Sequence, residues 1–274
     1  RYAFVAYLPA LLGMILLINF LDFGEVKVRF IEIVNKLKKK REMNIEEYAK
    51  HKYFFTLEIP QLLLKHMKKT KWNTFLDVGC GDGNLLYTLN EKGYFNGKKV
   101  YAVDLSKESI RRVNSLGKNF SCFVNNACDL KDIKDNSIDV LTSTMVIEHV
   151  ADDKQMVKEI HRVLNPKTNI AYVNTVFKKW YGWYWYRNHG KWVLDPTHLR
   201  EYTDDSLLKV FENEGLEILE TKKTLLWFSP VNMIVRITHY AKDTKDNKFL
   251  KFIDRIKVPI FGYYNWEIVC RRVK

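Results

Sequence analysis

Apolar segments of strand length alternate with segments whose apolar residues recur every three or four positions, from residue 74 to residue 175. The first kind of segment predicts strands and the second predicts amphipathic helices. A chain that alternates strand and helix forms a parallel, doubly wound sheet covered by helices, so we expect an α/β fold. The predicted strands cover residues 74–78, 99–104, 120–125, 137–143 and 169–175, and the predicted helices cover 83–92, 107–116 and 152–164.

Further elements are predicted on either side of this alternation. A helical pattern over residues 46–68 precedes the first strand. Another helix is expected to start near Glu201, with Thr203 as its N-cap, because a threonine side chain can accept a hydrogen bond from the first turn. Residues 216–221 and 263–272 predict a last, antiparallel pair of strands, which brings the sheet to seven.

The most informative stretch lies where the first strand meets the first helix. Asp77 is followed by Gly79, Gly81 and Gly83, and a helix starts at once. Glycines allow positive φ angles and a close approach of backbone to a ligand, and a helix N-terminus offers unpaired N–H groups. The next strand ends in Asp104, where a carboxylate can accept hydrogen bonds from a ribose diol. An acid before the glycines favours the cationic amino-acid end of S-adenosylmethionine (SAM) over a pyrophosphate.

With these motifs in order, residues 75–219 resemble the class I SAM-dependent methyltransferases, in the UbiE/UbiG-like, methyltransferase type 11 branch. The resemblance implies a Rossmann-like, seven-stranded fold with insertions over the acceptor site. It also implies that the protein is an enzyme, a SAM-dependent methyltransferase, with SAM as its cofactor. The cofactor-binding residues that it implies are Asp77, Gly79, Cys80, Gly81, Asp104, Leu105, Asp129, Leu130 and Met145.

Candidate catalytic residues follow the fourth predicted strand. Glu148 and His149 resemble the E-H-V element of UbiG-like O-methyltransferases, and His149 and His198 are candidate general bases because imidazole titrates near neutrality. A purely orienting role for His149 remains an alternative. In some relatives a glutamate three residues before the Glu-His pair completes a divalent metal site, but here that position is Met145, a poor ligand for a hard cation. We therefore predict no metal, with the alternative that Glu148, His149 and His198 hold one.

The segment around His198 also recurs in this branch, and the resemblance directs His198 and Arg200 towards the acceptor. Arg200 is expected either to meet an anionic group of the acceptor or to pair with Glu201 or Asp205.

The first residues of the chain predict a membrane anchor. Residues 2–21 are almost wholly apolar, and a spanning helix needs about 20 such residues. A hydrophobic core helix is the alternative. Residues 26–37 form a basic amphipathic pattern suited to a membrane surface, and positive charge follows the apolar segment, which places the catalytic part in the cytoplasm. We divide the chain into an anchor region, 1–43, and a methyltransferase domain, 44–274.

Two stretches are predicted to be acceptor-site insertions, near residues 177–200 and 225–258. The first is rich in Trp and Tyr beside Lys and Arg, a combination suited to a membrane interface. An aromatic subcore and base stacking on nucleic acid are the alternatives. The net charge of +13 favours an anionic partner, and four cysteines without paired spacing indicate a reducing compartment.

These observations together predict O-methylation of a membrane-associated or lipid-linked acceptor: a glycan, a quinone precursor or a polar lipid. The expected partners are a membrane, met through the N-terminal segment and the basic and aromatic surface, and the acceptor itself. The alternatives are C-methylation of a quinone ring, 2′-O-methylation of RNA, and a SAM-binding protein without catalysis.

Overall fold

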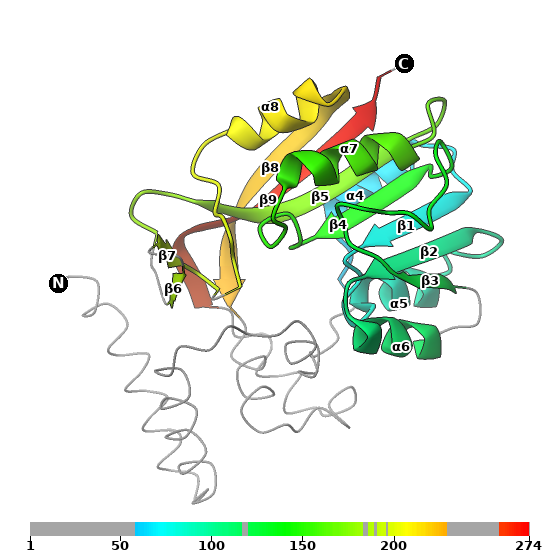
Figure 1. Ribbon diagram of the computed structural model, residues 1–274, viewed down its shortest axis with the longest axis horizontal. Coiled ribbons are helices and arrows are strands. Elements are labelled where there is room, and N and C mark those ends of the chain that lie inside the picture. Colours follow the sequence, from blue (N-terminus) through cyan, green and yellow to red (C-terminus); the bar gives the residue numbers. More distant parts are fainter. Residues whose placement is uncertain are drawn as a thin grey trace, which may run out of the picture. The chain divides into compact units, whose positions relative to one another are not determined.

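The computed structural model describes residues 58–116, 120–182, 186–188, 191–195, 197–228 and 258–273. A seven-stranded sheet of order β3-β2-β1-β4-β5-β9-β8 runs through this part of the chain (Figure 1). The first five strands are parallel, and β9 is antiparallel to β5. The strands are β1 (Thr74–Val78), β2 (Lys99–Asp104), β3 (Phe120–Val124), β4 (Val140–Thr144), β5 (Ile170–Lys178), β8 (Leu216–Phe228) and β9 (Val258–Arg272).

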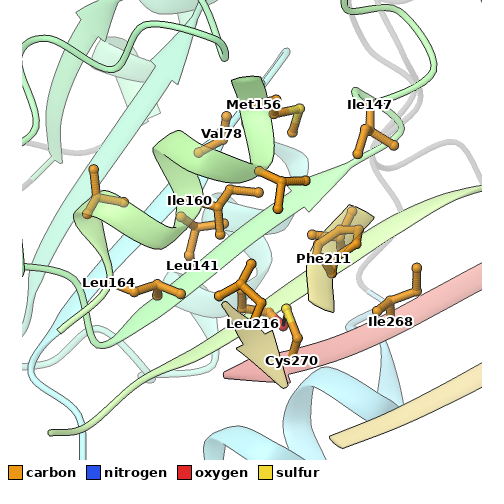
Figure 2. Packing of buried hydrophobic residues seen from close by; sticks show 14 of the residues in the cluster. Val78, Leu141, Ile147, Met156, Ile160, Leu164, Phe211, Leu216, Ile268 and Cys270 are labelled. Carbon is orange, nitrogen blue, oxygen red and sulfur yellow. Dashed lines mark hydrogen bonds between the residues drawn. The ribbon is translucent and has the colours of Figure 1, made fainter. Parts of the chain in front are cut away.

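Helices cover both faces of this sheet, and each face has its own apolar core. One core packs α7 and α8 on the sheet (Figure 2), and the other packs α4, α5 and α6. Neighbouring strand residues contribute to opposite cores; Phe75 faces the α4 side and Leu76 the α7 side, as expected of a strand buried on both faces. The helices are α4 (Gln61–Met67), α5 (Asn84–Glu91), α6 (Lys107–Leu116), α7 (Asp153–Val163) and α8 (Ser206–Asn213).

The predicted α/β fold with a seven-stranded, doubly wound sheet is confirmed. The predicted bounds of β1, β2 and α6 agree with the structure residue for residue. The predicted membrane helix and the basic amphipathic helix lie outside the described residues. Among the helices of the described part, none has the length and apolar character needed to cross a membrane.

The start of α8 was predicted wrongly. The helix begins at Ser206 with Asp205 as its N-cap, whereas the prediction placed the start near Glu201 with Thr203 as the cap. The helix does not start earlier because Tyr202 pairs with Phe177 of β5, and the Tyr202 carbonyl accepts from the N–H of Lys178 at 2.8 Å.

Other boundaries were also predicted wrongly. β4 begins three residues later than predicted, since the N–H groups of Ser137 and Ile138 bond instead to the Val163 carbonyl. The helical pattern over 46–68 yields only α4, which starts after Pro60, within the described residues. β8 and β9 are longer than predicted, so the predicted insertion at 225–258 gives its first four residues to β8 and its last to β9.

The insertion after β5 begins with a close backbone contact. Gly262 of β9 has φ +82°, and a Cβ atom there would lie 2.2 Å from the Cα atom of Gly182. The Gly262 carbonyl accepts from the N–H of Lys179 at 2.8 Å. The chain then forms a short antiparallel pair, β6 (Tyr186–Asn188) and β7 (Lys191–Val193).

Asp139 joins the two segments that lead into β1 and β5, at the edge of the sheet where these strands begin. One carboxylate oxygen accepts from the N–H groups of Asn73 and Thr74, at 2.8 and 3.1 Å. The other accepts from the side chains of Asn165 and Thr168, at 3.0 and 2.8 Å. Asp139 is 6% exposed, so water cannot readily replace its carboxylate as the acceptor for these donors.

We expect Asp139→Ala to lower the free energy of unfolding by about 3 kcal/mol, because it leaves buried donors unpaired. Urea unfolding followed by circular dichroism measures the change. Glu212→Ala, which removes an exposed carboxylate from α8, is the matched control and is expected to change stability by less than about 0.5 kcal/mol. Equal effects of the two substitutions would contradict the prediction.

Candidate functional site

The glycine loop between β1 and α5 is held by β2 on one side and by the segment after β4 on the other. The N–H groups of Gly79 and Cys80 donate to the carbonyl of Val103 in β2, at 2.8 and 3.0 Å. Gly79 has φ +72°, and a Cβ atom there would lie 2.3 Å from Cγ2 of Val146. Only glycine fits at this position, and the loop therefore packs directly on the segment that follows β4.

The next glycine faces open space. Gly81 has φ +51°, and a Cβ atom there would meet nothing within 4 Å. Its N–H donates to Oδ2 of Asp104 at 2.8 Å, while Oδ1 of Asp104 accepts from the N–H of Ser106 at 2.9 Å. Asp104 thus joins the loops after β1 and β2 at the carboxyl edge of the sheet. An open backbone cradle beside a carboxylate fits the predicted cofactor, with the glycine loop on its methionine part and the acid at its ribose.

Asp77 lies beneath this cradle and is 4% exposed. Its Oδ1 accepts a hydrogen bond from the Thr142 hydroxyl of β4 at 2.7 Å. Burial raises the pKa of Asp77 to about 7, and the nearby charge of Asp104 adds to the rise while the Thr142 hydrogen bond opposes it. A cation placed beside Asp77 would favour its ionised form, which suits the ammonium group of the predicted cofactor.

The other predicted cofactor residues occupy different environments. Leu105 is 48% exposed beside Asp104, and Asp129 is exposed in a turn after β3, so both are accessible to a ligand. Leu130 is fully buried in the core, where its N–H donates to Glu159, so its side chain presents no surface. Cys80 is also buried, which raises the pKa of its thiol well above the usual range. Met145 has φ +54° and lies half-buried at the end of β4.

The two candidate catalytic histidines lie side by side. The rings of His149 and His198 meet edge to face, with centroids 4.8 Å apart. Nδ1 of His149 is 3.0 Å from the hydroxyl of Thr197 and 3.2 Å from its carbonyl oxygen. Nδ1 of His198 is 3.1 Å from Oε1 of Glu201. Burial lowers the pKa of His198, but the Glu201 hydrogen bond and the charge of Glu148 outweigh it, so that this pKa is raised.

Glu148 lies against both histidines and is 1% exposed. Its Oε2 accepts from the Thr175 hydroxyl of β5 at 2.8 Å, whereas Oε1 is buried without a hydrogen-bond partner. Burial raises the pKa of Glu148, and the two histidines oppose the rise. A buried carboxylate oxygen without a partner is costly, which points to a ligand at this position.

Glu148, His149 and His198 fit a metal ion. One ligand atom of each lies within 4.8 Å of the others. Two imidazoles and one carboxylate suit Zn²⁺ better than Mg²⁺, which prefers oxygen ligands. These three residues are therefore the set that would hold an ion in the alternative to our prediction that no metal binds.

Arg200 has neither of the intramolecular partners that the sequence predicted. Its Nη2 donates to the Ala151 carbonyl at 2.7 Å, and its Nη1 lies 3.4 Å from Asp153. The reason is that the N–H groups of residues 199 and 200 both bond to the Glu148 carbonyl, which turns Arg200 towards α7.

Sequence reasoning missed the residues that support the site. Thr142 and Thr175 are buried polar positions in β4 and β5, next to the buried Ser143 and Asn174, and buried polar side chains usually have a hydrogen-bond partner. Asp195 and Glu201 flank His198 at three residues on either side, a spacing that suggests carboxylates near an imidazole.

Comparison with known proteins agrees with this geometry. Residues 76–171 match the family model described as a methyltransferase domain. A ubiquinone biosynthesis O-methyltransferase of Idiomarina loihiensis is 29% identical over 160 residues, which cover 52% of this chain and 63% of that protein. A probable SAM-dependent methyltransferase of Mycolicibacterium smegmatis is 26% identical over 182 residues, 66% of this chain and 65% of the relative.

Among solved structures, the [4+2]-cyclase SpnF matches with a TM-score of 0.54 and 17% identity, over 78% of this chain and 79% of that one. This likeness concerns the fold alone. The chain spans less than two thirds of the length of each of these two curated relatives.

We expect Asp77→Asn to flatten the pH dependence of stability. A folded-state pKa of about 7, above the unfolded value of about 3.9, means that the stability Asp77 contributes is present below pH 4 and lost as pH rises through 7. From pH 5 to pH 8 the natural protein should lose about 2–3 kcal/mol more than the variant. Urea unfolding at several pH values, without cofactor, measures this difference.

In SAM titrations the same variant should bind the cofactor about tenfold more weakly, because the partner of its ammonium group is gone. Glu212→Gln removes an exposed carboxylate on α8 and serves as the control for both measurements. A variant that keeps the full pH slope would show that another group titrates.

The metal-site alternative predicts that Zn²⁺ binds to the protein in a ratio of one to one. Equilibrium dialysis measures the ratio, and the visible absorption of bound Co²⁺ reports the ligands. His149→Ala and His198→Ala should each abolish binding, whereas His161→Ala, on α7 near Gly215, should not. Uptake that survives loss of both His149 and His198 would place the ion elsewhere.

Proposed function

Because residues 76–171 form a methyltransferase domain of the class I, UbiE/UbiG-like type, we propose that this chain transfers a methyl group from SAM to a hydroxyl oxygen of its acceptor. The cofactor is SAM. One observation carries the proposal: the glycine loop packs on Val146, which directly precedes the segment with Glu148 and His149. The donor cradle and the candidate bases are thereby held at one edge of the sheet.

Methyl transfer to a hydroxyl requires that the methyl group and the acceptor oxygen are aligned and that the hydroxyl proton is removed. When bound, SAM supplies a methyl group activated by its sulfonium. The glycine loop and the carboxylate of Asp104 line the cofactor cradle, and His149 and His198 face the acceptor. A histidine nitrogen that accepts the hydroxyl proton raises the nucleophilicity of the oxygen, and fixed geometry supplies most of the remaining acceleration.

A metal-assisted version of the same transfer is the second candidate. It is favoured by the unpartnered Oε1 of Glu148 beside the two histidines. An ion held by Glu148, His149 and His198 would act as a Lewis acid on the acceptor hydroxyl.

A membrane-associated or lipid-linked acceptor is the substrate class that we propose: a glycan, a quinone precursor or a polar lipid. The strand β5 ends at the same edge as the site, and it is followed by Trp180, which is 89% exposed, and Tyr181. Trp227 and Phe261, in β8 and β9, are also more than half exposed. Exposed Trp and Tyr beside lysines suit the boundary of a lipid bilayer, and the apolar segment at 2–21 agrees with this location.

The test is incubation of the purified full-length chain with methyl-labelled SAM and, separately, with native lipid extract and with total RNA. We expect label in the lipid phase as an alkali-stable O-methyl ether, because the site offers a base for a hydroxyl. Glu148→Gln should reduce the label at least tenfold. Loss of label with a chelator would select the metal-assisted version.

Each alternative has its own outcome. Label in RNA would move the acceptor to nucleic acid, and label on a ring carbon would indicate C-methylation. SAM binding without any labelled product would support a protein without catalysis.

The double variant Trp180→Ser, Trp227→Ser should bind fewer anionic vesicles in flotation than Leu199→Ser, which alters another exposed apolar residue. Unchanged flotation would contradict the membrane surface.

A further inference from the structure

The nitrogen Nδ1 of each histidine is held by a separate acceptor on residues 195–201. For His149 the acceptors are the hydroxyl and the carbonyl oxygen of Thr197. A carbonyl oxygen can only accept, so Nδ1 of His149 must donate and therefore carries the proton. The lone pair of the neutral ring is then at Nε2.

The direction of the hydrogen bonds around Thr197 agrees with this assignment. The Thr197 hydroxyl lies 2.6 Å from Oδ1 of Asp195, to which it donates. The N–H of Thr197 donates to the same oxygen at 2.8 Å. With its proton directed to Asp195, the hydroxyl oxygen presents a lone pair to His149. His149 thus donates to Thr197 and Thr197 donates to Asp195, so that the two hydrogen bonds run in one direction.

Glu201 does the same for His198. Its side chain is 4% exposed, and its oxygens also face the Lys178 ammonium at 3.5 Å, the Tyr263 hydroxyl at 3.3 Å and the N–H of Leu194. A carboxylate surrounded by donors accepts from every neighbour, so Nδ1 of His198 donates to it as well. This ring, too, has its lone pair at Nε2 when neutral.

We propose that Asp195, acting through Thr197, and Glu201 are positioning residues that hold His149 and His198 as Nδ1–H tautomers. Both lone pairs then belong to the Nε2 atoms. The same arrangement serves a proton acceptor and a metal ligand, since each needs a lone pair at a defined nitrogen. The catalytic purpose of these tautomers rests on the proposed function, whereas the tautomers themselves can be measured without methyl transfer.

The segment that supplies these acceptors is itself anchored. The N–H groups of Leu199 and Arg200 donate to the Glu148 carbonyl at 3.0 and 3.3 Å, and Arg200 is tied to α7. Glu148 therefore fixes the backbone that orients both rings. Histidines set by such partners lose little entropy on binding a substrate, and loss of a partner in such sites costs about 10–100-fold in activity or metal affinity.

The experiment is long-range ¹⁵N–¹H correlation spectroscopy on full-length protein labelled at histidine nitrogen, with no metal added. Both histidines should show the Nδ1–H pattern in the natural protein. His66, whose Nε2 lies 2.9 Å from Glu220, provides a signal of the opposite orientation for reference. An Nε2–H pattern for His149 or His198 would overturn the proposal.

Two variants with a matched control test the residues named. Thr197→Val removes the hydroxyl but keeps the carbonyl acceptor, so it should move part of the His149 population to the Nε2–H form. Thr197→Ser, which keeps the hydroxyl, should retain the natural pattern. Glu201→Leu should let His198 populate the Nε2–H form, because leucine removes the acceptor of the Nδ1 proton. Unchanged tautomers in variants that fold normally would show that these residues do not set them.

For a working acceptor, kcat should fall about tenfold or more in Thr197→Val while KM for SAM stays within about twofold. The NMR patterns are measured without any acceptor. Failure of the proposed methyl transfer is therefore distinguishable from failure of this inference.

Discussion

The acceptor side of the site depends on the burial of Glu148. A carboxylate taken out of water is costly unless neighbouring groups compensate. Here Thr175 donates to one oxygen and two imidazoles lie against the group, while the backbone carbonyl of the same residue receives two N–H groups from residues 199 and 200. The end of β4, the middle of β5 and the loop before α8 are thereby joined through a single residue.

A chain with a net charge of +13 gathers acids at the edge where its ligands should bind. These acids differ in the groups that compensate their negative charge. Asp104 accepts two backbone N–H groups, whereas Asp77 has one hydroxyl and a raised pKa, which leaves it dependent on a cation from outside the protein. The net charge of the chain and the charge at this edge therefore have opposite signs, and buried Asp77 favours a cationic ligand there.

The sequence predicted the donor half of the molecule closely and the acceptor half only in part. β1, β2 and α6 have clear apolar periods bounded by glycines or acids, so local pattern decides their ends. The start of α8 depends on the pairing of Tyr202 with β5, and the partner of Arg200 depends on the bonds of residues 199 and 200 to Glu148. Such contacts join residues far apart in the chain. No local period encodes them, which is also why the roles of Thr197 and Glu201 required the structure.

The contact between Gly182 and Gly262 fixes the point at which the insertion leaves the sheet. Because the two backbones touch, neither glycine can be replaced without parting the insertion from β9. The chain meets β5 and β9 again through Glu201, which faces Lys178 and Tyr263. The insertion is therefore held at both of its ends, and a change in its length must be absorbed between these two anchor points rather than in the sheet.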